Sequence, residues 1–294
     1  MDKKKIGLYA AGIVAVLVLP LILQSFGNAW VRIADTALLY VILALGLNIV
    51  VGYAGLLDLG FVAFYAAGAY LFALMASPHL AQTFAGFAAL FPNGLHTSLW
   101  VVIPLAMALA GFLGVLLGAP TLKLRGDYLA IVTLGFGEIV RIFLNNLDHP
   151  YNITNGPKGL NQIDSIHILG LNLGRPFDLF GYTIPSVTLY YYLFLFFVVL
   201  TIVICYRLQT SRVGRAWMAI REDEIAAKAM GINTRNMKLL AFGMGASFGG
   251  VSGAMFGAFQ GFVSPESFSL MESVMIVAMA VSYTHLTLPT KRIV

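Results

Sequence analysis

Long runs of hydrophobic residues, separated by shorter polar segments, dominate the pattern along the chain. Seven runs are clear and an eighth begins near Ser273; the seven cover residues 6–26, 33–51, 59–76, 99–119, 128–147, 187–206 and 239–260. A helix needs about 20 apolar residues to cross a hydrocarbon core of about 30 Å, and each run provides close to that number. A membrane β-barrel instead has short segments of alternating polarity. The pattern therefore predicts an all-α, polytopic membrane helix bundle with about 7–8 transmembrane helices.

The composition supports this fold class and excludes others. Of the 294 residues, 59% are hydrophobic and only 11% are charged. A soluble domain has about 25% charged residues, so a soluble enzyme is excluded. The aromatic content of 13% excludes an intrinsically disordered chain. The single Cys205 and the five dispersed histidines indicate neither an internal disulfide nor a metal site, and we expect no cofactor on this chain.

Basic residues are distributed unequally between the segments on the two sides of the bundle. With the N-terminus inside, the outer segments hold Arg32, Lys158 and Arg175. The inner segments hold Lys3, Lys4, Lys5, Lys123, Arg125, Arg207, Arg212, Arg215, Arg221, Lys228, Arg235 and Lys238. This asymmetry follows the positive-inside rule and predicts a cytoplasmic N-terminus. The net charge of +5 is thus a topology signal, which favours contact with membrane lipid and does not indicate nucleic-acid binding.

Two long polar segments are surfaces on which soluble partners could dock, residues 145–185 outside and residues 207–238 inside. The inner segment has no Gly or Pro from Trp217 to Met230, which predicts one helix that stops at Gly231. Its expected apolar face comprises Ile220, Ile225, Ala229 and Met230, and its expected charged face comprises Arg221, Asp223, Glu224 and Lys228. Such a helix could bind an ATPase or lie on anionic lipid, and the periodicity alone leaves both interpretations open.

Three motifs, in this order along the chain, resemble those of branched-chain amino-acid ABC permeases of the LivM type. They are GYAGLLDLG at 52–60, KLRGDYLAIVTLGFGEIVR at 123–141 and GRAWMAIREDE at 214–224. Ala226, Ala227 and Gly231 also match part of the E-A-A-x-x-x-G coupling loop of ABC importer permeases, although the Glu stands one position early, at Glu224. The resemblance extends from Met1 to about Ala280.

By that resemblance, the chain is a permease subunit that moves branched-chain amino acids or related amides across a bacterial inner membrane. Its implied partners are a sister permease subunit, two cytoplasmic ABC ATPase subunits and a periplasmic amino-acid-binding protein. The chain has no G-x-x-x-x-G-K-[ST] loop, so ATP would be bound by the ATPase subunits. The implied ATPase-coupling residues are Arg215, Arg221, Glu222, Asp223, Glu224, Ala226, Ala227 and Gly231.

Glu138 and Arg141 are charged residues within the fifth hydrophobic run. Glu138 lies about 15 Å along a helix from Tyr128, near the midplane, where a charge costs at least about 2.5–3.5 kcal/mol. Both side chains should therefore face the protein interior or a water-filled path, and their spacing places them on one helical face. They could form a gating pair or an ion pair that fixes packing. As an ion relay they would support an alternative function, an ion-coupled carrier or channel.

An enzyme is not expected, since the spans show no nucleophile with a base and no carboxylate pair.

Glycines interrupt the sequence between the second and third runs. Asp58 could cap a helix that begins at Leu59. Alternatively, Gly52, Gly55 and Asp58 could form a broken-helix element that binds substrate, with Asn48 contributing an amide. These four residues join Glu138 and Arg141 as candidates for the translocation pathway.

Glycines also recur at a strict four-residue step in the seventh run and at its outer edge. They are Gly245, Gly249, Gly253, Gly257 and Gly261. A stripe of small residues lets another helix approach closely within a membrane, which is the simpler interpretation. The alternative is a sliding surface during gating or an interface with the sister permease.

The character of the sequence changes near residue 281. The apolar stretch 273–281 corresponds to about 13 Å of helix, less than half a bilayer. The residues that follow alternate in polarity and reach Pro289. We therefore expect residues 1–280 to be a C-terminally incomplete permease domain and residues 281–294 a non-native tail, rather than a short polar final span.

Overall fold

The computed structural model describes residues 3–92, 94–122, 124, 127–168, 171–179 and 182–286. Its α-helices are α1 (Lys3–Ser25), α2 (Asn28–Asn48), α3 (Val62–Met75), α4 (His79–Thr83), α5 (Ala85–Leu90), α6 (Leu99–Thr121), α7 (Asp127–Asn146), α8 (Ser186–Thr210), α9 (Arg212–Glu222), α10 (Glu224–Ala229), α11 (Thr234–Gln260) and α12 (Leu270–Leu286). A π-helix, η1 (Ile49–Tyr53), extends α2, and two 3-10 turns are η2 (Gly156–Lys158) and η3 (Pro265–Phe268).

Within the described residues, five helices are long and apolar enough to cross a membrane. They cover Asn28–Tyr53, Leu99–Thr121, Tyr128–Asn146, Ser186–Thr210 and Thr234–Gln260. Val14–Ser25 and Val62–Met75 are shorter apolar helices. The prediction of an all-α polytopic membrane bundle is therefore confirmed, whereas the expected count of 7–8 crossings exceeds these five spans.

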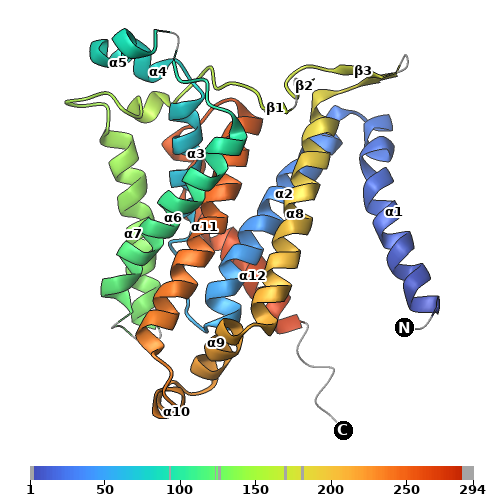
Figure 1. Ribbon diagram of the computed structural model, residues 1–294. Coiled ribbons are helices and arrows are strands. Elements are labelled where there is room, and N and C mark those ends of the chain that lie inside the picture. The colour runs from blue at the N-terminus through green and yellow to red at the C-terminus, as the bar shows by residue number, and fades with distance from the viewer. Residues whose placement is uncertain are drawn as a thin grey trace.

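The long helices stand side by side, and shorter elements cover the two ends of the bundle (Figure 1). Helices α4 and α5 lie at one end with two small antiparallel hairpins, β1 (His167–Ile168) with β2 (Leu171–Asn172) and β3 (Phe177–Leu179) with β4 (Tyr182–Ile184). Helices α9 and α10 lie at the opposite end, toward which α1 begins. The two polar segments of the sequence thus lie at opposite ends of the molecule.

Helix α11 is the central element, and glycines allow its neighbours to approach its backbone. A Cβ atom on Gly253 would lie 2.0 Å from the carbonyl oxygen of Tyr65 in α3. On another face, a Cβ on Gly250 would lie 2.5 Å from the carbonyl oxygen of Ala106 in α6. Side chains do not fit at either place, so glycine is required for these contacts.

The predicted glycine stripe divides between two roles. Gly245 faces Gly46 of α2 and Val50 of η1, and Gly249, Gly253 and Gly257 face α3. These four glycines are occupied within the chain, which removes them from an interface with another subunit. Gly261 differs, because it follows the last residue of α11 with a φ of 68° and has open space around it. It ends the helix, and no described residue of this chain packs closely against it, so the expected helix contact within the chain is not found at Gly261.

The segment between η1 and α3 is irregular and buried. Asp58 does not cap α3, which begins at Val62 with Phe61 at its N-cap. The Asp58 carboxylate instead accepts a hydrogen bond from the Gly60 amide at 2.9 Å, closing a local turn. Thr133 of α7 accepts from the Leu59 amide at 3.0 Å, and Ser273 of α12 donates to the Leu59 carbonyl. These bonds tie the irregular segment to two helices.

Helix α12 is longer than its apolar stretch. It has 17 residues, from Leu270 to Leu286, which is about 26 Å of helix. The helix continues past residue 281 because residues 282–286 contain no Gly or Pro and the first breaker is Pro289, and whether residues 281–294 are a non-native tail stays a prediction. Residues 287–294 of the expected tail lie outside the described residues.

We predict that Gly253→Ala lowers the stability of the bundle by about 1–3 kcal/mol, because the added methyl group collides with backbone and must separate α11 from α3. Gly135→Ala in α7 is the matched control, since a Cβ there meets open space. Thermal unfolding of the purified protein in detergent measures the difference. Equal melting temperatures for the two variants would contradict the close packing of α11.

Candidate functional site

The inner segment forms two helices in place of the one predicted. Helix α9 ends at Glu222 and α10 begins at Glu224. Asp223 separates them because its backbone is extended and its Oδ1 atom accepts hydrogen bonds from Ile225 (2.8 Å) and Ala226 (3.1 Å). After α10, Gly231 has a φ of 85°, a conformation that glycine adopts readily at a helix end.

Trp217 anchors α9 to the rest of the bundle. Its side chain is fully buried, and its Nε1 atom donates a hydrogen bond of 2.7 Å to the Met237 carbonyl in α11. It packs in a cluster that includes residues of η1, α8 and α11. Lys238 adds an ion pair of 2.7 Å with Glu224, which fastens α10. Sequence reasoning missed these anchors, although a tryptophan in a largely polar segment was the available signal.

The predicted apolar face of this segment is wrong. Ile220 is buried as expected, but Ile225 and Met230 are 74% and 84% exposed, and Ala229 is exposed. The break at Asp223 turns α10 relative to α9, so that residues on either side of it no longer share one face. In α10, Ala227 is the buried residue.

The other implied coupling residues lie around these helices. Glu222, Asp223 and Ala226 are exposed. Arg215 is exposed, and its Nη1 atom donates to the Thr210 carbonyl at 2.8 Å. Arg221 is different, because its Nη1 atom reaches the Gly52 carbonyl of η1 at 2.5 Å. The structure thus brings one coupling residue to the broken end of α2.

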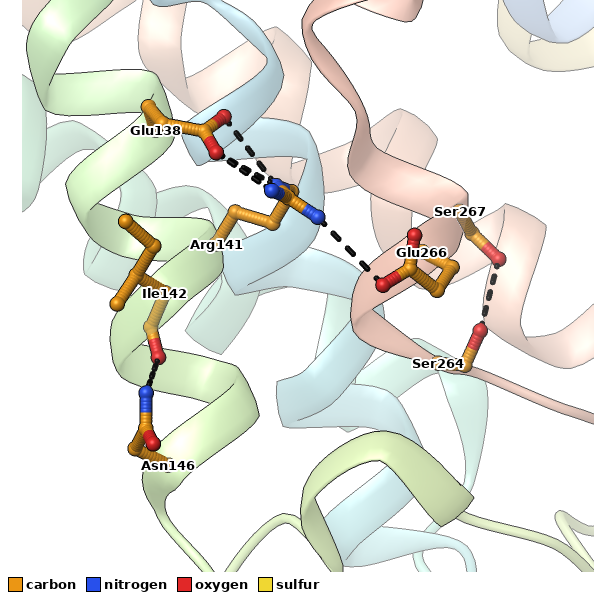
Figure 2. Close-up of polar contacts among 7 residues, drawn as sticks. All are labelled: Glu138, Arg141, Ile142, Asn146, Ser264, Glu266 and Ser267. Atoms are coloured by element: carbon orange, nitrogen blue, oxygen red, sulfur yellow. Dashed lines mark hydrogen bonds and ion pairs between the residues drawn. The ribbon is translucent and has the colours of Figure 1, made fainter.

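Glu138 and Arg141 form an ion pair on one face of α7. The Nη2 atom of Arg141 lies 2.5 Å from Glu138 Oε1, and its Nε atom bonds the same carboxylate at 3.0 Å. Figure 2 shows that Arg141 also points toward Glu266 of η3, at 3.5 Å. The pair is partly exposed in this single chain, so it faces the surface beside η3 and not a deep interior. Glu266 was not predicted, because its position depends on the return of the chain after α11.

Figure 2 also shows the neighbouring contacts that hold the two elements in shape. Asn146 donates to the Ile142 carbonyl at 2.7 Å within α7. The hydroxyl groups of Ser264 and Ser267 lie 3.5 Å apart across η3. Arg141 is therefore bracketed by two carboxylates, from elements that are separately stabilised.

A cavity of about 840 Å³ lies between α2, η1, α8 and α12. Its lining is mostly apolar, with Asn48, Tyr53 and Cys205 toward the inner end. The Asn48 Oδ1 atom is buried and has no hydrogen-bond partner among the described residues. It occupies the space where a Cβ on Gly52 would lie, 1.9 Å away. Of the pathway candidates, Asn48 thus lines the cavity and Gly52 makes room for it.

The remaining pathway candidates lie elsewhere. Gly55 lies beside Arg221, and Asp58 lies in the turn beside Thr133 of α7. Glu138 and Arg141 lie on α7, an element that does not line the cavity. The six residues therefore do not form a single site. Among the described residues, no group of three or more His, Cys, Asp or Glu side chains could hold a metal ion.

Comparison with known proteins identifies the family of this chain. Residues 29–285 match the family model of the permease component of branched-chain amino acid transport systems. The chain belongs to this family. The family resemblance identified in the three sequence motifs is therefore confirmed, and the family is one of transport proteins and not of enzymes.

The curated relatives include permease proteins named LivM and permease proteins named LivH. The chain is 45% identical over 264 residues to the high-affinity branched-chain amino acid transport system permease protein LivM of Escherichia coli and to that of Salmonella typhimurium, covering 85% of the chain. It spans 57% of the length of those relatives. It is 26% identical over 238 residues to LivH of Salmonella typhimurium, covering 77% of the chain and 68% of the relative. No solved structure matches the chain.

We predict that Glu138 and Arg141 are energetically coupled. Glu138→Gln should destabilise the protein more than Glu138→Gln combined with Arg141→Met, since the single change leaves a cation that has lost its closer partner. With Arg141→Met alone as the third variant, the cycle should show the interaction energy of about 0.5–3 kcal/mol that contacting residues typically have. Unfolding of the purified variants in detergent measures it. Glu266→Gln is the control, and its effect should be smaller because its contact is longer and more exposed.

Additive effects of the two changes would show that the ion pair does not fix packing. Substrate uptake in the same variants tests the alternative role. An ion-coupled carrier requires a titratable Glu138, so uptake by the double variant would exclude Glu138 as an ion relay.

Proposed function

We propose that this chain is a membrane subunit of an ABC importer that moves branched-chain amino acids, or closely related amides, into a bacterial cell. Membership of the permease family supports this function, and the LivM relatives are named for branched-chain amino acid transport. The observation that carries the proposal is the α9–α10 unit, which is anchored to α11 and presents large apolar side chains to solvent. An ATPase subunit would dock there.

The topology supports an orientation in which α9 and α10 lie on the cytoplasmic side of the membrane. We propose that α1, α3 and α12 also cross the inner membrane, in addition to the five long spans, so that the bundle has eight crossings. The start of α1 lies toward the end that carries α9 and α10 (Figure 1). The excess of Lys and Arg in the inner segments favours the cytoplasm for that end. The opposite end, with α4, α5 and the hairpins, would face a periplasmic amino-acid-binding protein.

The partners follow from the same proposal. A sister permease is supported by the similarity to LivH, which belongs to the same type of transport system. Two cytoplasmic ABC ATPase subunits would bind and hydrolyse ATP, and this chain would convert their movement into passage of the substrate. The ion-coupled alternative is less favoured, because Arg141 is held by two carboxylates in an arrangement suited to packing.

The proposed docking surface consists of Ile225 and Met230, together with the exposed residues Glu222, Asp223 and Ala226. Large apolar side chains exposed at the water-facing end of a membrane protein indicate contact with another protein. Ala227 is buried beneath α10, and Glu224 is paired with Lys238 of α11. Pressure on α10 would therefore be transmitted to α11, the central helix of the bundle.

The cavity between α2, η1, α8 and α12 is proposed to form part of the translocation pathway. Its apolar lining suits an aliphatic side chain, and Asn48 adds a polar residue to that lining. Gly52 and Gly55 would shape this part of the pathway through their close neighbours.

We predict that Ile225→Glu and Met230→Glu each abolish binding of the ATPase subunits without lowering the melting temperature of the permease, since both side chains are exposed. Leu90→Glu is the matched control, because Leu90 is 76% exposed on α5 at the other end. Pull-down of the ATPases and substrate-stimulated ATP hydrolysis in the reconstituted complex are the measurements. Unchanged binding and stimulation in both variants would overturn the proposed docking surface.

A further inference from the structure

Arg221 joins two elements that are far apart in the sequence. Its Nη1 atom donates a hydrogen bond of 2.5 Å to the carbonyl of Gly52, 169 residues away. Gly52 lies in the π-helix η1, where the helical ladder is shifted. In an α-helix the Gly52 carbonyl would accept from the Leu56 amide, but that amide donates to Val50 at 3.0 Å. The Arg221 guanidinium replaces the missing donor with a charge-assisted bond.

The path of the Arg221 side chain depends on Gly55. A Cβ on Gly55 would lie 2.8 Å from the Cγ atom of Arg221 and 3.2 Å from its Cβ atom. Gly55 also has a φ of 69°, which side chains rarely adopt. The chain therefore turns sharply at this position and leaves a channel through which Arg221 reaches the Gly52 carbonyl.

The other side of η1 forms part of the cavity wall. Asn48 lies over Gly52, and both Asn48 and Tyr53 line the cavity. Gly52 is thus bound by Arg221 through its carbonyl and covered by a cavity residue at its Cα atom. Because the Arg221 bond joins α9 to η1, movement of α9 would be transmitted to η1 while that bond persists.

We propose that Arg221 is a positioning residue that fixes the cavity wall at η1 to helix α9, so that displacement of α9 moves η1 and with it Asn48 and Tyr53. The idea that an ATPase displaces α9 rests on the proposed function, in which an ATPase docks on α9 and α10. The bond itself is a property of this chain alone. The competing role for Arg221 is a direct charged contact with the ATPase, with no effect on the cavity.

Cys205 provides a probe for the state of this wall. It is the single cysteine of the chain, it is 5% exposed, and it lines the cavity. It also packs in one cluster with Ile49 and Val50 of η1 and with Trp217 of α9. Loosening of η1 should therefore expose the thiol to a small maleimide.

The first experiment measures the rate of maleimide reaction with Cys205 in membranes that contain the full chain. Arg221→Met should raise the rate severalfold, and Arg221→Lys should raise it less, because lysine keeps one donor for the carbonyl. Arg212→Met is the matched control, since Arg212 is an exposed arginine at the opposite end of α9, and its rate should equal that of the unaltered chain. Cys205→Ser gives the background.

Equal rates for Arg221→Met, Arg212→Met and the unaltered chain would overturn the proposal. The assay needs no ATPase, so this result would leave the importer function untouched. Conversely, failure of the Ile225 and Met230 variants to affect ATPase binding would overturn the docking surface and leave the bond between Arg221 and η1 standing.

The second experiment separates coupling from docking in the reconstituted complex. Arg221→Met should retain ATPase binding but reduce severalfold the amino acid transported per ATP hydrolysed, with partial rescue by Arg221→Lys. Loss of ATPase binding with an unchanged maleimide rate would assign Arg221 to the direct contact and overturn the positioning role. An unchanged transport ratio would also overturn it.

Discussion

Close contact between α11 and its neighbours is the interaction on which the rest of the bundle depends. Within a bilayer, apolar side chains gain little by leaving lipid for one another, so helices associate through dense packing of their backbones. Gly253 brings α11 against the Tyr65 carbonyl of α3, and Gly250 brings it against Ala106 of α6. These contacts make α11 the rigid axis to which α9, α10 and the cavity wall at η1 are attached.

The elements outside this axis are held by polar bonds to main-chain atoms. Trp217 bonds the Met237 carbonyl, Arg221 bonds the Gly52 carbonyl, and Ser273 bonds the Leu59 carbonyl. The Gly52 carbonyl lies in the π-helix and the Leu59 carbonyl lies in the irregular segment before α3, whereas the Met237 carbonyl, in the first turn of α11, accepts through its second lone pair. Irregular backbone is therefore tolerated here because it is buried in protein and satisfied by side chains.

The sequence predicted the helices well and their ends poorly, for a physical reason. The bilayer requires about 20 apolar residues per crossing, so the spans are visible as composition alone. The break at Asp223 and the turn at Asp58 depend on which amide a carboxylate accepts from, and several amides compete over a few residues. Packing decides which amide donates to the carboxylate, and this packing cannot be read from a single sequence.

The site residues were predictable to the extent that their partners are close in sequence. Glu138 and Arg141 share a helical face and form the expected pair, while Glu266, from an element far along the chain, could not be predicted. Likewise, the family motif indicated Arg221 as a coupling residue but not its bond to Gly52. The exposure of Ile225 and Met230 depends on the turn between α9 and α10, which the periodicity of one continuous helix concealed.

The packing of α11 against α2 and α3 also has a consequence for biogenesis. Helices α2 and α3 are synthesised early and α11 late, and the ribosome adds only about 5–20 residues per second. During that interval the glycine-facing surfaces of α2 and α3 have no permanent neighbour and must remain in lipid or beside the insertion machinery. The inner segment is made just before α11, so Trp217 waits for its acceptor at Met237 only while the next 20 residues are added. Assembly of the core is therefore a late event in the life of the nascent chain, and the early helices must tolerate the membrane as isolated spans.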